Sequence, residues 1–333
     1  MIDAPPYRQK LRKVGESAMK FVDADMVHRL LDYPGLVEAL RVAHKGASPK
    51  SDASVMDEPA GGDNKFVSLV AWAAQEVIAV KLVGVFPSNL ALEPPQPSVQ
   101  GLVAVFDGKT GAPVLAADGA ALTFRKTAAD SALGARFLAR EDADVLLVIG
   151  AGGLAPHVIL AHTSVRPSIK RVLVWNRTPA RAEALAREMQ IAGVSISAVR
   201  DLEAALPAAD VISCVTMSTA PLVKGALLKK GAHVDLIGAY LPTMREADDE
   251  TIQRGRVFVD TRVGMEGAGD LFQPVERGLF AWTDIQADHF ELCTGTKSGR
   301  KDQSEITVFK NVGGGHLDLF TARHLRNGLQ QVA

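Results

Sequence analysis

The sequence predicts an α/β protein with a parallel sheet in its middle and a mixed α+β region built from its two ends. At 333 residues the chain is too long for one ordinary compact domain and suits two. Between residues 144 and 260, short β-rich runs alternate with helical runs, which implies βαβ units and a parallel sheet. The first of these runs, 145–149, leads directly into a glycine-rich loop.

The N-terminal third is predicted to contain two helices followed by antiparallel strands. Asp25 can cap a helix that begins at Met26, Tyr33-Pro34 can break it, and apolar positions over 36–42 indicate a second helix. The stretch 46–64 is rich in serine, proline, aspartate and glycine, so we expect a loop there. Strands are predicted over 66–72, 77–86, 102–106 and 113–117, with turn signals at 107–111 joining the last two as a hairpin.

A long helix pattern runs from Thr127 to Arg140 and opens the alternating region. We expect Asp130 and Ser131 on that helix to be surface and packing residues. Strands are predicted over 145–149, 172–175, 195–199, 211–215, 234–237 and 257–259. Strand 306–309 and helix 317–327 are expected to return to the first domain.

Composition excludes several classes of protein. Apolar residues make up 47% of the chain and charged residues 23%, and the net charge of −1 comes without a basic stripe, which argues against nucleic-acid binding. No apolar run reaches the ~20 residues that span a bilayer, and residues 1–15 lack the apolar core of a secretory signal. The presence of only two cysteines, Cys214 and Cys293, suits a reducing compartment, and a disulfide between them remains an alternative. We therefore expect a cytoplasmic protein, and without paired-cysteine spacing or HExxH we expect no metal site.

The strongest motif is the loop Gly150-Ala151-Gly152-Gly153-Leu154-Ala155, which matches G-x-G-x-x-A between a predicted strand and a predicted helix. Gly150 permits the tight turn, Gly152 lets the backbone approach a pyrophosphate, and Ala155 allows close packing of helix and strand. The N-terminus of the helix offers unpaired N–H groups to phosphates. The sequence therefore predicts a Rossmann domain that binds a dinucleotide.

The next predicted strand ends in Asn176-Arg177-Thr178, where an NAD-specific site usually carries an acidic residue for the ribose hydroxyls. A neutral amide, a cation and a hydroxyl suit a 2′-phosphate instead. We expect NADPH as cofactor, with NADH left open. Val215, Thr216 and Gly238, at the ends of later strands, complete the predicted cofactor-binding set.

Several motifs in a fixed order resemble the ornithine cyclodeaminase/μ-crystallin family over nearly the whole chain. They are residues 80–89, 107–111, 118–123, 127–140, the glycine loop and 306–318. The resemblance implies a Rossmann NAD(P)-binding domain, 127–304, inserted into an α+β substrate-binding and dimerisation domain, 1–126 plus 305–333. It also implies a homodimer with the active site in the cleft between the domains.

The resemblance also implies which residues bind substrate. It places Lys81 against the substrate carboxylate, and a charged lysine in an otherwise apolar strand would be costly to bury without a partner. Lys126 stands where family members commonly have an arginine for the same carboxylate. Thr123 is expected to line the pocket.

One departure favours a reductase over a lyase. Cyclodeaminases resemble one another in placing an aspartate after the run that ends at Ala239, and this chain has Tyr240 there. A phenol is a poor base at neutral pH because its unperturbed pKa is about 10.

We therefore expect NADPH-dependent reduction of a cyclic ketimine carboxylate, either Δ1-pyrroline-2-carboxylate or Δ1-piperideine-2-carboxylate, to the cyclic amino acid. Lys81, Tyr240 and His316 are the candidate proton donors, and Lys81, Lys126, His316 and Tyr240 are the candidate catalytic residues. The alternatives are an ornithine cyclodeaminase, an alanine-type amino-acid dehydrogenase and a non-catalytic NADPH-dependent binding protein.

Overall fold

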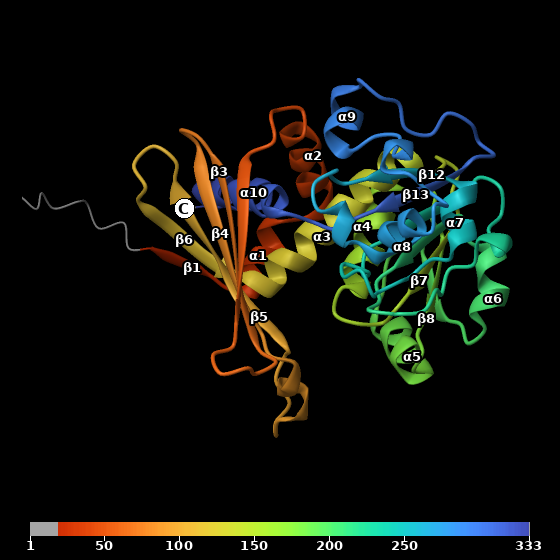
Figure 1. Cartoon of the computed structure of the whole chain (residues 1–333), viewed down its shortest axis with the longest axis horizontal. Helices are drawn as coiled ribbons and strands as arrows, with labels where there is room; N and C mark the ends of the chain where they lie inside the picture. Colours follow the sequence, from red (N-terminus) through yellow and green to blue (C-terminus); the bar gives the residue numbers. More distant parts are fainter. Residues whose placement is uncertain (1–18, 333) are drawn as a thin grey trace, which may run out of the picture.

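The computed structural model describes residues 19–332, so the expectation for residues 1–15 lies outside the described part of the chain. Two sheets lie at opposite ends of the long axis, with helices between and around them (Figure 1). This agrees with the predicted α/β fold. No helix among the described residues is long and apolar enough to cross a membrane.

The first sheet has six strands in the order β1-β6-β5-β4-β3-β2. Its neighbours are antiparallel except for β1, which is parallel to β6. The strands are β1 (Lys20–Val22), β2 (Lys50–Asp57), β3 (Lys65–Ala73), β4 (Val77–Val85), β5 (Val99–Asp107) and β6 (Pro113–Asp118).

Strand β2 corrects the prediction of a loop over 46–64. It pairs with β3 from Lys50–Trp72 to Asp57–Lys65. All of its residues are exposed, so the strand lacks the alternation of buried apolar and exposed polar residues by which strands are predicted from sequence. Pairing with the edge of β3 overrides the low strand propensity of its serines and aspartates.

Three helices cover one face of this sheet or flank it: α1 (Ala24–Leu30), α2 (Tyr33–Ala43) and α10 (Gly315–Val332). Asp23, and not Asp25, caps α1 by accepting from the Met26 N–H at 2.8 Å. Tyr33-Pro34 begins α2 instead of breaking a helix, because proline is tolerated in the first helical turn and Asp32 caps it.

The second sheet has seven parallel strands in the order β12-β13-β11-β10-β7-β8-β9. Its strands are β7 (Val145–Ile149), β8 (Arg171–Trp175), β9 (Ser195–Ala198), β10 (Val211–Cys214), β11 (His233–Leu236), β12 (Gly255–Val259) and β13 (Ile306–Lys310). The helices along it are α4 (Ala155–Val165), α5 (Pro179–Glu188), α6 (Leu202–Ala205), α7 (Asp249–Arg254), α8 (Gly269–Glu276) and α9 (His289–Thr294).

Strand β13 does not return to the first domain as expected. It lies between β12 and β11, and all five of its residues are buried. The chain leaves the alternating pattern before this strand, which suggested the first domain, but a strand buried along its whole length is typical of the interior of a parallel sheet. The limits predicted for the two domains, 1–126 plus 305–333 and 127–304, remain a prediction. Within them, β13 was expected in the first domain and lies in the second sheet.

Helix α3 (Gly119–Leu138) joins the two sheets. It begins at Gly119 and not near Thr127, because Asp118 caps it by accepting from the Ala121 N–H at 2.8 Å. Gly119 packs directly on Gly101 of β5, where an added Cβ would lie 2.7 Å from the Gly101 carbonyl. The helix contacts α2, α4 and α10, so it runs through the core. Its Asp130 and Ser131 are fully buried, which corrects the expected surface position of Asp130.

Candidate active site

Two of the predicted site residues, Lys81 and Lys126, lie on either side of one carboxylate. Lys81 is on β4, on the same face as the buried Ala79, and Asp318 is on the facing helix α10. The Lys81 Nζ lies 3.0 Å from Asp318 Oδ2, and the Lys126 Nζ lies 2.9 Å from Asp318 Oδ1. The three side chains come from three elements and are almost completely buried.

This group has a net charge of +1 in a nearly dry environment. Burial lowers the pKa of Lys81 to about 8, and Lys126 adds to the effect while Asp318 opposes it. Burial would raise the pKa of Asp318, but Lys126 and Lys81 outweigh it and hold the pKa below its usual value. The uncompensated positive charge suits a small anion such as a carboxylate. The sequence analysis gave Asp318 no role, although an aspartate on the apolar face of a helix signals a buried partner.

Thr123 lines a cavity of about 120 Å³ between β4, β5 and the first turns of α3. Val83, two residues along β4 from Lys81, lines the same cavity, as do Gly101, Gly119 and Phe124. Thr123 and Lys126 are three residues apart and therefore share a face of α3. The cavity thus lies along the same two elements that carry the lysines.

The glycine loop has the shape that dinucleotide binding requires. Gly150 has φ +115°, and an added Cβ would lie 2.9 Å from the Val215 carbonyl oxygen. Gly152 faces open space, because no atom of residues 19–332 lies within 4 Å of an added Cβ. Helix α4 follows without a side-chain cap on its N-terminus. The open space over Gly152 beside an uncapped helix end fits a pyrophosphate.

Phe124 connects this loop to the cavity. An added Cβ on Gly153 would lie 2.9 Å from the Phe124 ring, which also lines the cavity. The Phe124 ring stacks on His157 of α4 with centroids 5.0 Å apart. The glycine loop and the cavity next to Thr123 therefore lie on two sides of the Phe124 ring.

The end of β8 is built around Asn176. Its Oδ1 accepts from the Ala151 N–H at 3.1 Å, and its Nδ2 donates to the Thr178 carbonyl at 3.0 Å. Arg177 is exposed next to it. An open hollow of about 550 Å³ lies beside this edge, and Trp175, Arg200 and Lys224 are among its lining residues. Sequence analysis missed Arg200 and Lys224, because they follow other strands of the sheet.

Glu246 connects the segments that follow β10 and β11 through hydrogen bonds to both. Its Oε1 accepts from the Thr216 N–H at 2.6 Å and from the Thr216 hydroxyl at 3.0 Å, and its Oε2 accepts from the Gly238 N–H at 2.7 Å. Burial raises the pKa of Glu246 to about 7, against the opposing effect of Lys310. Val215, Thr216 and Gly238 thus converge at one edge of the sheet. The sequence offered no signal for Glu246, which lies beyond the strand in an irregular segment.

The two other candidate proton donors have different surroundings. Tyr240 is exposed, and its N–H donates to the Gly238 carbonyl at 3.1 Å. His316 is buried at the start of α10. Its burial, together with His44 and Lys126, lowers its pKa to about 3. His316 is therefore a neutral imidazole at neutral pH.

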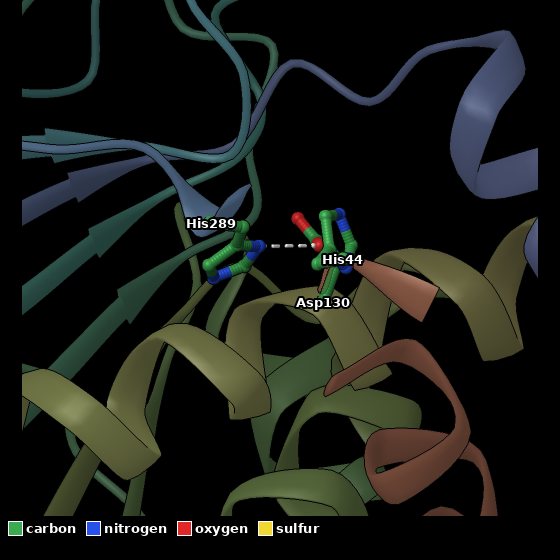
Figure 2. A group of neighbouring side chains, drawn as sticks. All are labelled: His44, Asp130 and His289. Atoms are coloured by element: carbon green, nitrogen blue, oxygen red, sulfur yellow. Dashed lines mark hydrogen bonds and ion pairs between the residues drawn. The ribbon is translucent and has the colours of Figure 1, made fainter. Parts of the chain in front are cut away.

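Figure 2 shows a second buried cluster, which consists of His44, Asp130 and His289. The ring centroids of His44 and His316 are 5.6 Å apart. The His289 Nδ1 is 2.9 Å from Asp130 Oδ1, and the His44 Nδ1 is 2.8 Å from the Leu40 carbonyl. All three side chains are fully buried. Sequence analysis did not predict this cluster.

Known proteins resemble this chain over almost its whole length. The model of the ornithine cyclodeaminase/mu-crystallin family matches residues 20–332. The chain is 38% identical over 310 residues to a Delta(1)-pyrroline-2-carboxylate reductase from Paracoccus denitrificans, and the match covers 93% of this chain and 96% of that protein.

Two solved structures have the same fold. The Delta(1)-pyrroline-2-carboxylate reductase from Thermococcus litoralis, in complex with NADH and L-proline, is similar with a TM-score of 0.87 and 28% identity, covering 94% of this chain and 98% of that one. The iminosuccinate reductase of Paracoccus denitrificans, in complex with NAD+, gives a TM-score of 0.82 at 27% identity and covers 94% and 97%.

Proposed function

Because the chain belongs to the ornithine cyclodeaminase/mu-crystallin family, we propose that it is an NAD(P)H-dependent reductase that acts on the C=N bond of a small imino acid. The substrate we favour is a cyclic ketimine carboxylate, with Δ1-pyrroline-2-carboxylate ahead of its six-membered analogue. The observation that carries this proposal is the pair Lys81 and Lys126 around Asp318, which leaves one buried positive charge for one carboxylate.

The residues around the glycine loop fit a nicotinamide dinucleotide. Gly152 and the start of α4 would hold the pyrophosphate, and the segment from Val215 to Gly238 would hold the nicotinamide end. A bound nicotinamide cofactor supplies the hydride that reduces the imine carbon. The protein supplies the position of the substrate and the charge around it.

Lys81 has two tasks in this proposal. As an ammonium group it pairs with the substrate carboxylate together with Lys126. With a pKa of about 8 it also holds a proton at neutral pH that it can give to the ring nitrogen. Neutral His316 and exposed Tyr240 are weaker candidates for the second task.

NADPH is the cofactor we favour over NADH, because the end of β8 carries the exposed Arg177 and no acidic residue in the run Asn176-Arg177-Thr178. Arg200 and Lys224 in the hollow beside it are already paired with Glu183 and Glu203. The substitution Arg177→Asp should shift preference toward NADH, since the new carboxylate repels a 2′-phosphate and can accept from ribose hydroxyls. The ratio of kcat/KM with NADPH to that with NADH measures this. An unchanged ratio would show that Arg177 has no part in the choice.

The first sheet offers a surface for a homodimer. The strand register places Phe21, Met56, Phe66, Val70 and Trp72 on one face, opposite the face that carries Lys81. All five are exposed. An apolar sheet face of this kind marks a protein interface, and we propose a second copy of the chain as its occupant.

Parallel assays of purified protein test the proposed reaction. We expect NADPH to be consumed with Δ1-pyrroline-2-carboxylate and proline to form in equal amount. Δ1-Piperideine-2-carboxylate tests whether the enzyme accepts a six-membered ring, and iminosuccinate tests whether it accepts an imine with a second carboxylate. Ornithine alone tests for a cyclodeaminase. Pyruvate with ammonia tests for an alanine-type dehydrogenase. Proline from ornithine without cofactor consumption would overturn the proposal, and cofactor binding without turnover would favour a binding protein.

A further inference from the structure

We propose that His44, Asp130 and His289 form a structural metal site that takes a divalent transition-metal ion of the zinc class. One potential ligand atom from each residue lies within 4.8 Å of the others, and all three residues are fully buried. The proposed reductase activity does not require this site. The site therefore stands or falls separately from the reaction.

Unpaired atoms are the first argument. His44 Nε2 and Asp130 Oδ2 are buried without a hydrogen-bond partner among the described residues. A buried polar atom without a partner costs roughly 1–3 kcal/mol, so two of them in one cluster indicate that a binding group belongs there.

The hydrogen bond at the other side of His44 fixes which nitrogen is free. The Leu40 carbonyl can only accept, so the Nδ1 of His44, 2.8 Å away, carries the ring proton. The Nε2 then holds a lone pair and no hydrogen. Metal-bound histidines commonly have this arrangement, in which a backbone carbonyl accepts from the second ring nitrogen and orients the ring.

The positions of His289 and Asp130 also suit an ion. The His289 Nδ1 and Asp130 Oδ1 face each other at 2.9 Å (Figure 2). Two ligands of a tetrahedral ion with bonds near 2.0–2.1 Å lie roughly 3.4 Å apart. An ion would therefore need only a small opening of this pair, and a potential ligand atom of His44 already lies within 4.8 Å of both. His316, whose buried Nε2 has no hydrogen-bond partner in the described part of the chain, is the candidate for a fourth ligand, with its ring centroid 5.6 Å from that of His44.

The donor set favours a transition metal. Two imidazoles and one carboxylate are typical ligands of zinc and its neighbours, whereas calcium and magnesium prefer oxygen alone.

The three ligands come from the end of α2, from α3 and from α9. The ion would therefore connect helices of the first region to the second sheet through the helix that joins them. We infer a structural role, in which the ion stabilises the contact between the two parts of the molecule.

The experiment measures the metal content of tag-free, full-length protein by mass spectrometry after dialysis. We expect about one ion per chain. Protein stripped of metal by a chelator should take up Zn²⁺ or Co²⁺ again, and its Tm should rise. The Co²⁺ form should show a d–d absorption typical of nitrogen and oxygen ligands. His44→Gln should lose the ion and the rise in Tm. His162→Gln is the matched control, because His162 is also fully buried but bonds to Asp235 at 3.2 Å.

Two results would overturn the proposal. The first is wild-type protein that, once stripped of metal, takes up neither Zn²⁺ nor Co²⁺, which would leave buried water as the partner of these atoms. The second is a His44→Gln variant that keeps the ion. If the variant does not fold, the wild-type stoichiometry and the Co²⁺ spectrum still decide. Turnover that persists in metal-free protein leaves the proposed function intact, and failure of the reductase assay leaves the metal stoichiometry unaffected.

Discussion

Asp318 sets how much positive charge the two lysines present to a ligand. At about 3 Å from both ammonium groups it neutralises one of them, and it keeps Lys81 and Lys126 from repelling each other directly. Each lysine alone would be an expensive buried cation, and the group of three is satisfied with one charge to spare. Binding of a substrate carboxylate would complete the neutralisation.

Replacing Lys81 with glutamine should lower kcat/KM for the imino acid by roughly 100-fold or more, because a buried ion pair to the substrate is lost. The cofactor Kd should not change, since Lys81 is on the first sheet and the glycine loop is on the second. Steady-state kinetics and fluorescence titration with NADPH measure the two quantities.

Lys65→Gln is the control for this substitution, because Lys65 is an exposed lysine of β3 that pairs with Asp57. It should leave both constants unchanged. A Lys81→Gln variant that loses only cofactor affinity would place Lys81 in a different role.

The pKa of Lys81 predicts a pH dependence. Its pKa is lowered to about 8, so the ammonium form dominates below pH 8 and is lost as the pH rises through that value. We expect kcat/KM for the imino acid to be steady below about pH 8 and to fall above it by up to tenfold per pH unit. Lys81→Arg, which keeps its charge, should remove this fall from whatever activity remains. A wild-type profile that stays flat well above pH 8 would contradict the assignment.

At the scale of secondary-structure elements, the sequence predicted most of the fold because most elements bury a periodic apolar face. Strands β3 to β11 lie close to their predicted ranges. Strand β2 was missed because none of its residues is buried, and only its pairing with β3 makes it a strand. Strand β13 was detected but misplaced, because its neighbours β11 and β12 precede it by long stretches of chain that local patterns cannot connect.

The glycine loop allows a substitution that separates folding from binding. Gly152→Val should leave the Tm of the cofactor-free protein unchanged, because an added Cβ meets no atom of the described residues within 4 Å. It should weaken NADPH binding by roughly 10-fold or more, because the side chain would occupy the space of the pyrophosphate. Gly150→Ala is the contrast: its positive φ and its contact with Val215 should lower the Tm as well. Unchanged NADPH affinity in Gly152→Val would remove the loop from the site.

At the scale of the whole molecule, the site was predictable only where family motifs carry it. Lys81 and the glycine loop stand in such motifs, and Lys126 directly precedes the motif that begins at Thr127. Asp318 stood in a motif but received no role, because its partners lie on other elements. Glu246 and the cluster of His44, Asp130 and His289 depend on contacts between segments far apart in the chain, so no local pattern announces them.

The proposed dimer predicts a change in mass. Trp72→Lys places a charge on the exposed apolar face, and burying that charge on association would be costly. We expect light scattering after size exclusion to show a dimer for the wild type and a monomer for the variant. Leu279→Lys, at an exposed leucine near α8, should stay dimeric. A dimeric Trp72→Lys variant would show that another surface holds the copies together.

The late position of β13 has a consequence for the nascent chain on the ribosome. Its place between β11 and β12 cannot be filled until residue 310 has left the exit tunnel, so until then β12 is separated by a gap from the other five strands of the second sheet. During that interval the apolar flanks of two strands have no neighbour, and such edges invite aggregation. Production of this protein should therefore depend on chaperones that shield nascent strands, and slower translation would prolong the exposed interval.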